Sequence, residues 1–110
     1  MAKIGQYFTA GSWLVKPGKE SEFIAAWDSF ARWTGSTQAG AGTGHLLQDS
    51  TNPRSFLSFG PWEKAESIDR WREETEFQAF VGKARELCDD IQPMTLNLVA
   101  IAHAKDSAAR

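Results

Sequence analysis

The order in which the hydrophobic pattern changes along the chain restricts the fold more than any other feature. Apolar and polar residues that alternate, or β-branched and aromatic clusters, indicate strands, whereas apolar residues recurring every three or four positions indicate amphipathic helices. The 110-residue chain has strand patterns over 6–15, 44–49, 55–60 and 95–103 and helix patterns over 19–33, 63–71 and 75–89. The predicted order is therefore β-α-β-β-α-β, with the second helical region broken near residue 74.

Local signals place the boundaries of these elements. The first helix carries an apolar stripe at Phe23, Trp27, Phe30 and Thr34, spaced by four, three and four positions. Residues 34–44 contain four glycines, which predicts a loop. Thr75 and Gln78 match a capping box, so we expect Thr75 to be the N-cap of the last helix. A proline at position 93 separates that helix from the final strand.

This order is typical of a ferredoxin-like α+β domain, an antiparallel sheet with both helices on one face. The two faces of a strand alternate along it, and both faces of the first and last strands carry apolar residues: Phe8 and Leu14 against Trp13 and Val15, and Leu96 and Leu98 against Val99 and Ile101. No third layer is encoded, so a second copy of the chain is the expected cover of the free face. We expect one domain over 1–110, with its core at 6–103 and a flexible tail at 104–110.

Composition excludes several functional classes. The net charge is −2, which argues against a nucleic-acid-binding protein. A single cysteine, Cys88, excludes an intrachain disulfide framework and is expected to be a small buried apolar residue. No apolar run is long enough to cross a membrane and no signal peptide is evident, so a cytoplasmic protein without membrane contact is expected. Five tryptophans favour cavity walls or interfaces, because each indole N–H needs a partner.

Three stretches of the chain resemble the antibiotic biosynthesis monooxygenase domain family of the dimeric α+β barrel superfamily. They are residues 13–20 followed by Phe23, residues 56–63, and Ile68-Asp69-Arg70-Trp71-Arg72 followed by Glu76-Phe77. The resemblance covers about residues 6–103. It implies a homodimer whose sheets pack face to face, with a cavity between each sheet and its helices or loops. Known members include cofactor-independent oxygenases acting on phenolic polyketides, haem-degrading enzymes and proteins without a known activity.

The haem-degrading branch uses an asparagine in the first strand, a tryptophan in the second helical region and a histidine about ten residues later. Trp71 matches the tryptophan, but Gly11 and Val81 occupy the other two positions. Because only one of these three positions matches, a haem-handling protein is a less favoured hypothesis than the two given at the end of this section.

No metal motif, phosphate-binding loop, catalytic triad or reactive-cysteine motif is present, so we expect no metal and no cofactor. If Leu46 faces the helices, His45 should face the other side together with Trp13, Ser58, Asn97 and His103. Aromatic walls with a few polar groups suit a flat, partly polar ligand. His45 or His103 would act as the general base, and ordinary strand histidines are the alternative.

Two further tryptophans complete the candidate site. Trp71 and Trp62 would form cavity walls, although a packing role also explains each of them. Asn97, on an otherwise apolar strand, would hydrogen-bond substrate or a second subunit, and an ordinary edge-strand residue is the alternative. Catalytic roles are therefore assigned to His45, Asn97 and Trp71, and substrate binding to Trp13, Ser58, Trp62 and His103. The charged side chains of residues 70 and 72–74 are expected on a solvated helix face.

The function that the sequence favours is that of a cofactor-independent monooxygenase, which oxidises a small aromatic or polyketide-like compound with molecular oxygen. A non-catalytic ligand-binding or stress-related dimer is the alternative from a different functional class.

Overall fold

The computed structural model describes residues 2–105 and contains a four-stranded sheet and three helices. The elements in chain order are β1 (Tyr7–Val15), α1 (Glu20–Thr37), β2 (His45–Gln48), β3 (Ser55–Trp62), α2 (Ala65–Glu73), α3 (Thr75–Leu87) and β4 (Cys88–Asn97).

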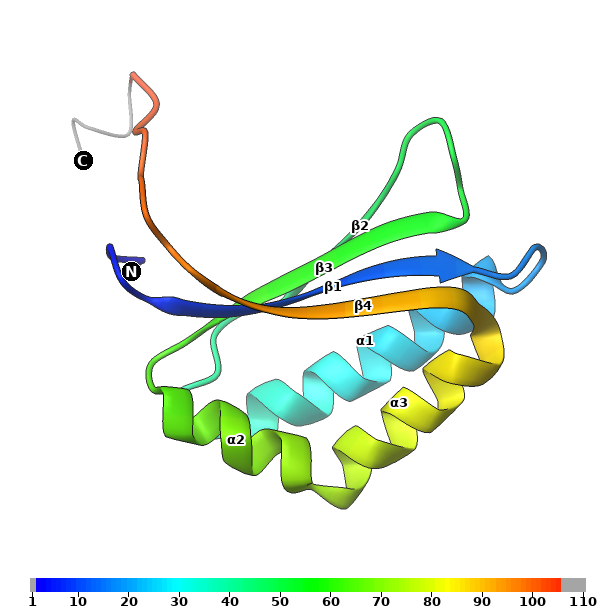
Figure 1. Cartoon of the computed structure of the whole chain (residues 1–110), viewed down its shortest axis with the longest axis horizontal. Helices are drawn as coiled ribbons and strands as arrows, with labels where there is room; N and C mark the ends of the chain where they lie inside the picture. The colour runs from blue at the N-terminus through cyan, green and yellow to red at the C-terminus, as the bar shows by residue number, and fades with distance from the viewer. Residues whose placement is uncertain (1, 106–110) are drawn as a thin grey trace.

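The sheet has the strand order β2-β3-β1-β4, and every neighbouring pair is antiparallel. All three helices lie on one side of the sheet (Figure 1). The order and layering confirm the ferredoxin-like α+β prediction, including the interruption between α2 and α3. None of the described helices is long and apolar enough to cross a membrane.

The prediction for the last strand is wrong in position. β4 begins at Cys88, directly after α3, and ends at Asn97, so it starts well before the predicted residue 95. Pro93 lies within it, opposite Gly11, because β4 is an edge strand and can accommodate a residue that lacks a backbone N–H. Leu98 still exchanges backbone hydrogen bonds with the chain at Gly5 and Gln6, but residues 98–103 form no strand.

Two helix boundaries also differ from the prediction. Helix α1 continues to Thr37, into the glycine-containing stretch expected to be a loop. Thr75 is the first residue of α3 and Glu74 is its N-cap, without a side-chain capping bond. Gln78 instead donates from Nε2 to the carbonyl oxygen of Arg72 at 2.8 Å, so it joins α3 to α2. The expected flexible tail lies largely outside the described residues.

The hydrophobic core joins the α1 and α3 helices to one end of the sheet. Its buried members are Val15, Phe23, Phe56, Phe80, Ala84, Leu87 and Cys88. Phe23 packs between Trp13 and Phe56, with ring centroids 5.3 and 5.2 Å apart. Burial of such aromatic side chains is the main stabilising contribution here, at about 1.5–3 kcal/mol each.

Cys88 is buried, as expected, and burial raises the pKa of its thiol to about 11, with a smaller contribution from the nearby Asp89 carboxylate. The folded protein therefore keeps the thiol proton at pH values where the unfolded chain, whose thiol has the ordinary pKa of 9.0, loses it. We expect the free energy of unfolding to fall as pH rises from about 9 to about 11. Denaturant unfolding over this range should show a steeper fall for the wild type than for Cys88→Ala. Parallel pH profiles would contradict this prediction.

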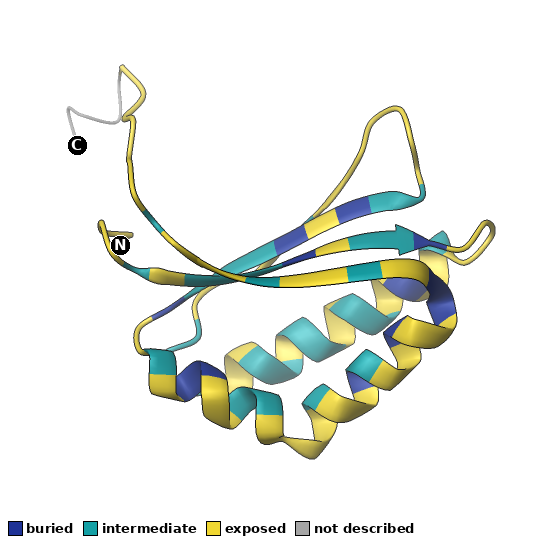
Figure 2. Ribbon diagram, viewed as in Figure 1, coloured by how far each residue is buried: buried dark blue, intermediate teal, exposed yellow. Residues whose placement is uncertain are grey.

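Within the described part of the single chain, no helix covers the sheet face opposite α1, α2 and α3, and Figure 2 shows exposed positions along the strands. Leu47 and Leu57 are directly paired on this face and are 51% and 43% exposed, and Leu96 beside Phe8 is 45% exposed. Exposed leucines on an uncovered sheet face are consistent with an interaction face.

Candidate functional site

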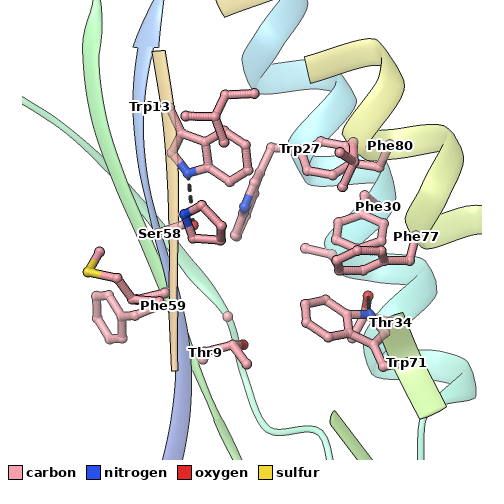
Figure 3. Close-up of a pocket in the computed structure, with 18 of the residues that line it drawn as sticks. Thr9, Trp13, Trp27, Phe30, Thr34, Ser58, Phe59, Trp71, Phe77 and Phe80 are labelled. Atoms are coloured by element: carbon pink, nitrogen blue, oxygen red, sulfur yellow. Dashed lines mark hydrogen bonds between the residues drawn. The ribbon is translucent and has the colours of Figure 1, made fainter. Parts of the chain in front are cut away.

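A cavity of about 880 Å³ lies between the helices and the sheet. This volume is within the range of small-molecule sites. The sheet contributes Trp13, Ser58, Thr9 and Trp62, and the helices contribute an aromatic wall. Figure 3 shows these two walls facing one another across the cavity.

The strand register explains why polar and aromatic groups share the sheet wall. Side chains directly opposite one another on paired strands lie on the same face. Gly11 pairs with Ser58 and Thr9 pairs with Gly60, which places every second residue of β1 and β3 toward the helices. Trp13 lies on this face and folds back over Gly11, where an added Cβ would be 2.7 Å from its ring.

Three indole N–H groups at the cavity are hydrogen-bonded to hydroxyl oxygens. Trp13 Nε1 donates to Ser58 Oγ at 3.0 Å (Figure 3), and Trp62 Nε1 donates to Thr9 Oγ1 at 2.9 Å. Trp71 Nε1 donates to Thr34 Oγ1 at 3.0 Å, which links α2 to α1. Each bond fixes the plane of an indole ring, so the aromatic surfaces are preorganised for a ligand.

The helix wall is a continuous group of aromatic rings. Phe30 of α1 lies parallel to Phe80 of α3, with centroids 4.3 Å apart and an interplanar angle of 1°. Trp71 of α2 packs on Phe30 at 5.5 Å and on Phe77 at 4.7 Å. It also contacts Trp62 of the sheet at 5.0 Å, so Trp71 joins the two walls.

A guanidinium group lies at the β4 side of the cavity. Arg72 lines the cavity, is half-buried, and donates from one of its terminal nitrogens to Thr95 Oγ1 at 2.7 Å. The expectation of a solvated helix face is therefore wrong for Arg72. Among residues 2–105, no carboxylate forms an ion pair with it, so its positive charge is available to an anionic ligand.

The structure brings together four of the seven candidate residues: Trp13, Ser58, Trp62 and Trp71 all line the cavity. The other three lie elsewhere and are exposed. His45 pairs with Phe59 on the opposite face of the sheet and stacks on its ring at 5.4 Å. Asn97 ends β4, and His103 follows the last strand.

The predicted grouping of His45 with Trp13 and Ser58 is wrong because Leu46, not His45, is opposite Ser58. Leu46 faces the helices as supposed, but Trp13 and Ser58 face them too. A change of one residue in register exchanges the two faces of a strand. The sequence supplied no register for β2 against β3 or for β3 against β1, the two pairings that relate His45 to Trp13.

Several cavity residues were missed. Thr9 and Thr34 were recognised only as strand and helix residues, and Arg72 only as a surface charge. Trp27 and Phe30 belonged to the predicted apolar stripe of the first helix and line the cavity. The one available signal was the surplus of tryptophans, because each buried indole requires an acceptor and the hydroxyl residues supply it.

The described residues contain no cluster of three or more His, Cys, Asp or Glu side chains that could hold a metal ion. The cavity also does not fit the haem-degrading arrangement. Gly11 is covered by the Trp13 ring, so a side chain at this position has no room. Val81, at the position of the iron-ligating histidine, lines the cavity with an aliphatic side chain that cannot ligate iron.

Comparison with solved structures finds the same fold in several proteins. A protein from Shewanella oneidensis is 22% identical, with a TM-score of 0.79 over 89% of this chain and 96% of that one. A conserved protein from Methanosarcina mazei is 19% identical, with a TM-score of 0.78 over 86% and 94%. SnoaB from Streptomyces nogalater, described as a cofactor-independent oxygenase and solved as a point mutant, is 15% identical, with a TM-score of 0.80 over 88% and 96%.

A comparison with curated protein sequences found no match. The family model described as antibiotic biosynthesis monooxygenase matches residues 7–83, which span β1 to most of α3. The matched segment therefore includes both aromatic walls of the cavity.

Proposed function

Because the chain belongs to the antibiotic biosynthesis monooxygenase family, we propose that it oxidises a small, flat aromatic or polyketide-like compound with molecular oxygen and without a cofactor. The observation that carries this proposal is the aromatic cavity in which three tryptophans are fixed by hydroxyl groups. SnoaB, which shares the fold, is described as a cofactor-independent oxygenase.

The reaction class is the conversion of an activated ring CH₂ to a carbonyl. The substrate loses a proton to solvent water to form a phenolate or enolate, and this anion transfers one electron to oxygen. The resulting superoxide and substrate radical combine to form a carbon–oxygen bond. The peroxide anion takes a proton back from solvent and then loses water as its O–O bond breaks. One oxygen atom enters the product and the other leaves as water, so the substrate loses four electrons and oxygen gains four.

The cavity supplies two of the conditions that this chemistry needs. Hydrogen bonds to an anion favour its ionised form, and the cavity hydroxyls and Arg72 can donate to a substrate oxygen. The aromatic walls exclude water, which strengthens these interactions and protects the radical pair. The side chains of His45, His103 and Asn97 do not line the cavity. The cavity geometry therefore gives no support to their general-base and substrate-contact roles, which stay predictions.

We further propose that the chain forms a homodimer through the apolar sheet face that contains Leu47, Leu57 and Leu96. Leu57→Glu should place a charge on this face and convert the dimer to a monomer of 12.2 kDa, because burial of an unpaired carboxylate is unfavourable. Light scattering gives the mass directly. Ile24→Glu is the matched control, since Ile24 is similarly exposed, at 41%, but lies on helix α1. A wild-type mass of one chain, or equal behaviour of the two variants, would contradict the interface.

Oxygen uptake by metal-free and flavin-free protein tests the activity. A panel of anthrones should produce uptake above the protein-free blank with at least one member. Tight ligand binding without uptake would instead support the non-catalytic binding protein. One observation favours that alternative: the indole-bonded polar groups of the cavity are hydroxyls, which cannot serve as a general base near neutral pH.

A further inference from the structure

We propose that Ser58 and Thr9 are a specificity-determining pair that donates hydrogen bonds to carbonyl or phenolate oxygens of the bound ring system. This inference rests on the proposed function for the nature of the ligand. In this proposal, two strand hydroxyls recognise the ligand. The site therefore prefers ligands that carry oxygen acceptors over hydrocarbons of the same shape.

The direction of the two hydrogen bonds leaves the hydrogen of each hydroxyl unused. An indole N–H can only donate, so Ser58 and Thr9 must accept from Trp13 and Trp62. A hydroxyl has one hydrogen and two lone pairs, and these bonds use lone pairs only. Within residues 2–105, neither hydroxyl donates to a side chain or backbone carbonyl. Each therefore keeps its hydrogen for a group inside the cavity.

The positions of the two hydroxyls favour this role over a purely structural one. Ser58 is 7% exposed, so its hydrogen has little access to bulk water, yet the residue lines the cavity. The register places Thr9 and Ser58 diagonally on neighbouring strands, and such positions are about 7–8 Å apart. Two donors on a flat wall at this spacing can contact two oxygen atoms of one planar ligand.

The tryptophans also strengthen the donors. A hydroxyl that accepts a hydrogen bond becomes a better donor, because bonds in a chain polarise one another. A developing negative charge on a substrate oxygen therefore meets hydroxyls already polarised by indole N–H groups. Desolvation of the unsatisfied hydroxyls would disfavour a ligand without acceptor oxygens.

The experiment compares two soluble probes of the same ring shape, anthraquinone-2-sulfonate and anthracene-2-sulfonate, by equilibrium binding titration. Ser58→Ala and Thr9→Val each remove an indole acceptor, which weakens binding of both probes. Each should in addition lower affinity for the quinone by about three- to tenfold relative to the hydrocarbon. Thr9→Ser keeps the hydroxyl and should restore quinone binding. Ser29→Ala, at an exposed position of α1, is the matched control and should change neither affinity.

Equal losses for both probes would overturn the proposal, because they would indicate a structural role in holding the indoles. Absence of any loss, or failure of the wild type to prefer the quinone, would overturn it as well. If Ser58→Ala does not fold, Thr9→Val and its Thr9→Ser rescue decide the question. Since the titration requires no turnover, it separates this proposal from the oxidation: quinone selectivity without oxygen uptake would retain the donors and reject the monooxygenase.

Discussion

Replacing Trp71 with alanine should lower kcat/KM for anthrone oxidation by about tenfold to a hundredfold, the range expected when a positioning wall is lost. Trp71 contacts Trp62, Phe30 and Phe77 and donates to Thr34. Its removal opens the helix wall to water and frees the walls to move apart. Since the residue is half-buried, we also expect a loss of about 2–3 kcal/mol in the free energy of unfolding, less than for a fully buried tryptophan.

Trp33→Ala is the control for Trp71→Ala. Trp33 is also half-buried and stacks on Phe30 at 5.8 Å, but it does not line the cavity. This variant should lose stability while its kcat/KM stays within about twofold of the wild type. Steady-state kinetics measured well below each thermal midpoint separates the two effects. Similar kinetic losses in both variants would show that Trp71 acts through stability alone.

Gly11→Ala should disrupt the sheet wall of the cavity. The backbone at Gly11 does not have a positive φ, so alanine is compatible with the strand. The added Cβ, however, would lie 2.7 Å from Trp13 Cζ2 and 2.9 Å from Nε1. The indole must move, which breaks its bond to Ser58 and its packing on Phe23. We expect a destabilisation of about 1–3 kcal/mol, typical of overpacking, and weakened binding of the aromatic probes.

Gly82→Ala should instead stabilise the protein. Gly82 lies within α3 and has no neighbour within 4 Å of an added Cβ. Alanine there should raise the free energy of unfolding by about 0.5–1 kcal/mol and leave probe binding unchanged. Chemical denaturation of both variants measures the stability changes. A Gly11→Ala protein as stable and as tightly binding as the wild type would show that the position of Trp13 is not important for the site.

The layers of the fold could be predicted from sequence because periodicity is local. The stripe from Phe23 to Thr34 lies on one side of α1, and the break after Glu73 is in the predicted place. The last strand could not be placed, because Pro93 is a breaker in most contexts and is tolerated here only by the edge position of β4. That position is a property of the assembled sheet and not of residues 88–97.

Only part of the candidate site could be predicted, because strand register, like the edge position of β4, is a property of the assembled sheet. Tryptophan composition and the family resemblance identified Trp13, Trp62 and Trp71, which all line the cavity. Which strand face each polar residue shares depends on register across distant segments. His45 was therefore placed with Ser58, whereas pairing brings Leu46 to that position. The hydroxyl partners Thr9 and Thr34 could not be assigned without knowing which indole each one meets.

Turnover of anthrone under ¹⁸O₂, with mass analysis of the product, tests directly whether this cavity oxidises an aromatic substrate with molecular oxygen. We expect anthraquinone to form faster than in the protein-free blank, with one ¹⁸O atom in the new carbonyl, and we expect Trp71→Ala to remove most of this increase. Product formation no faster than the blank, or a new carbonyl without ¹⁸O, would contradict this proposed activity.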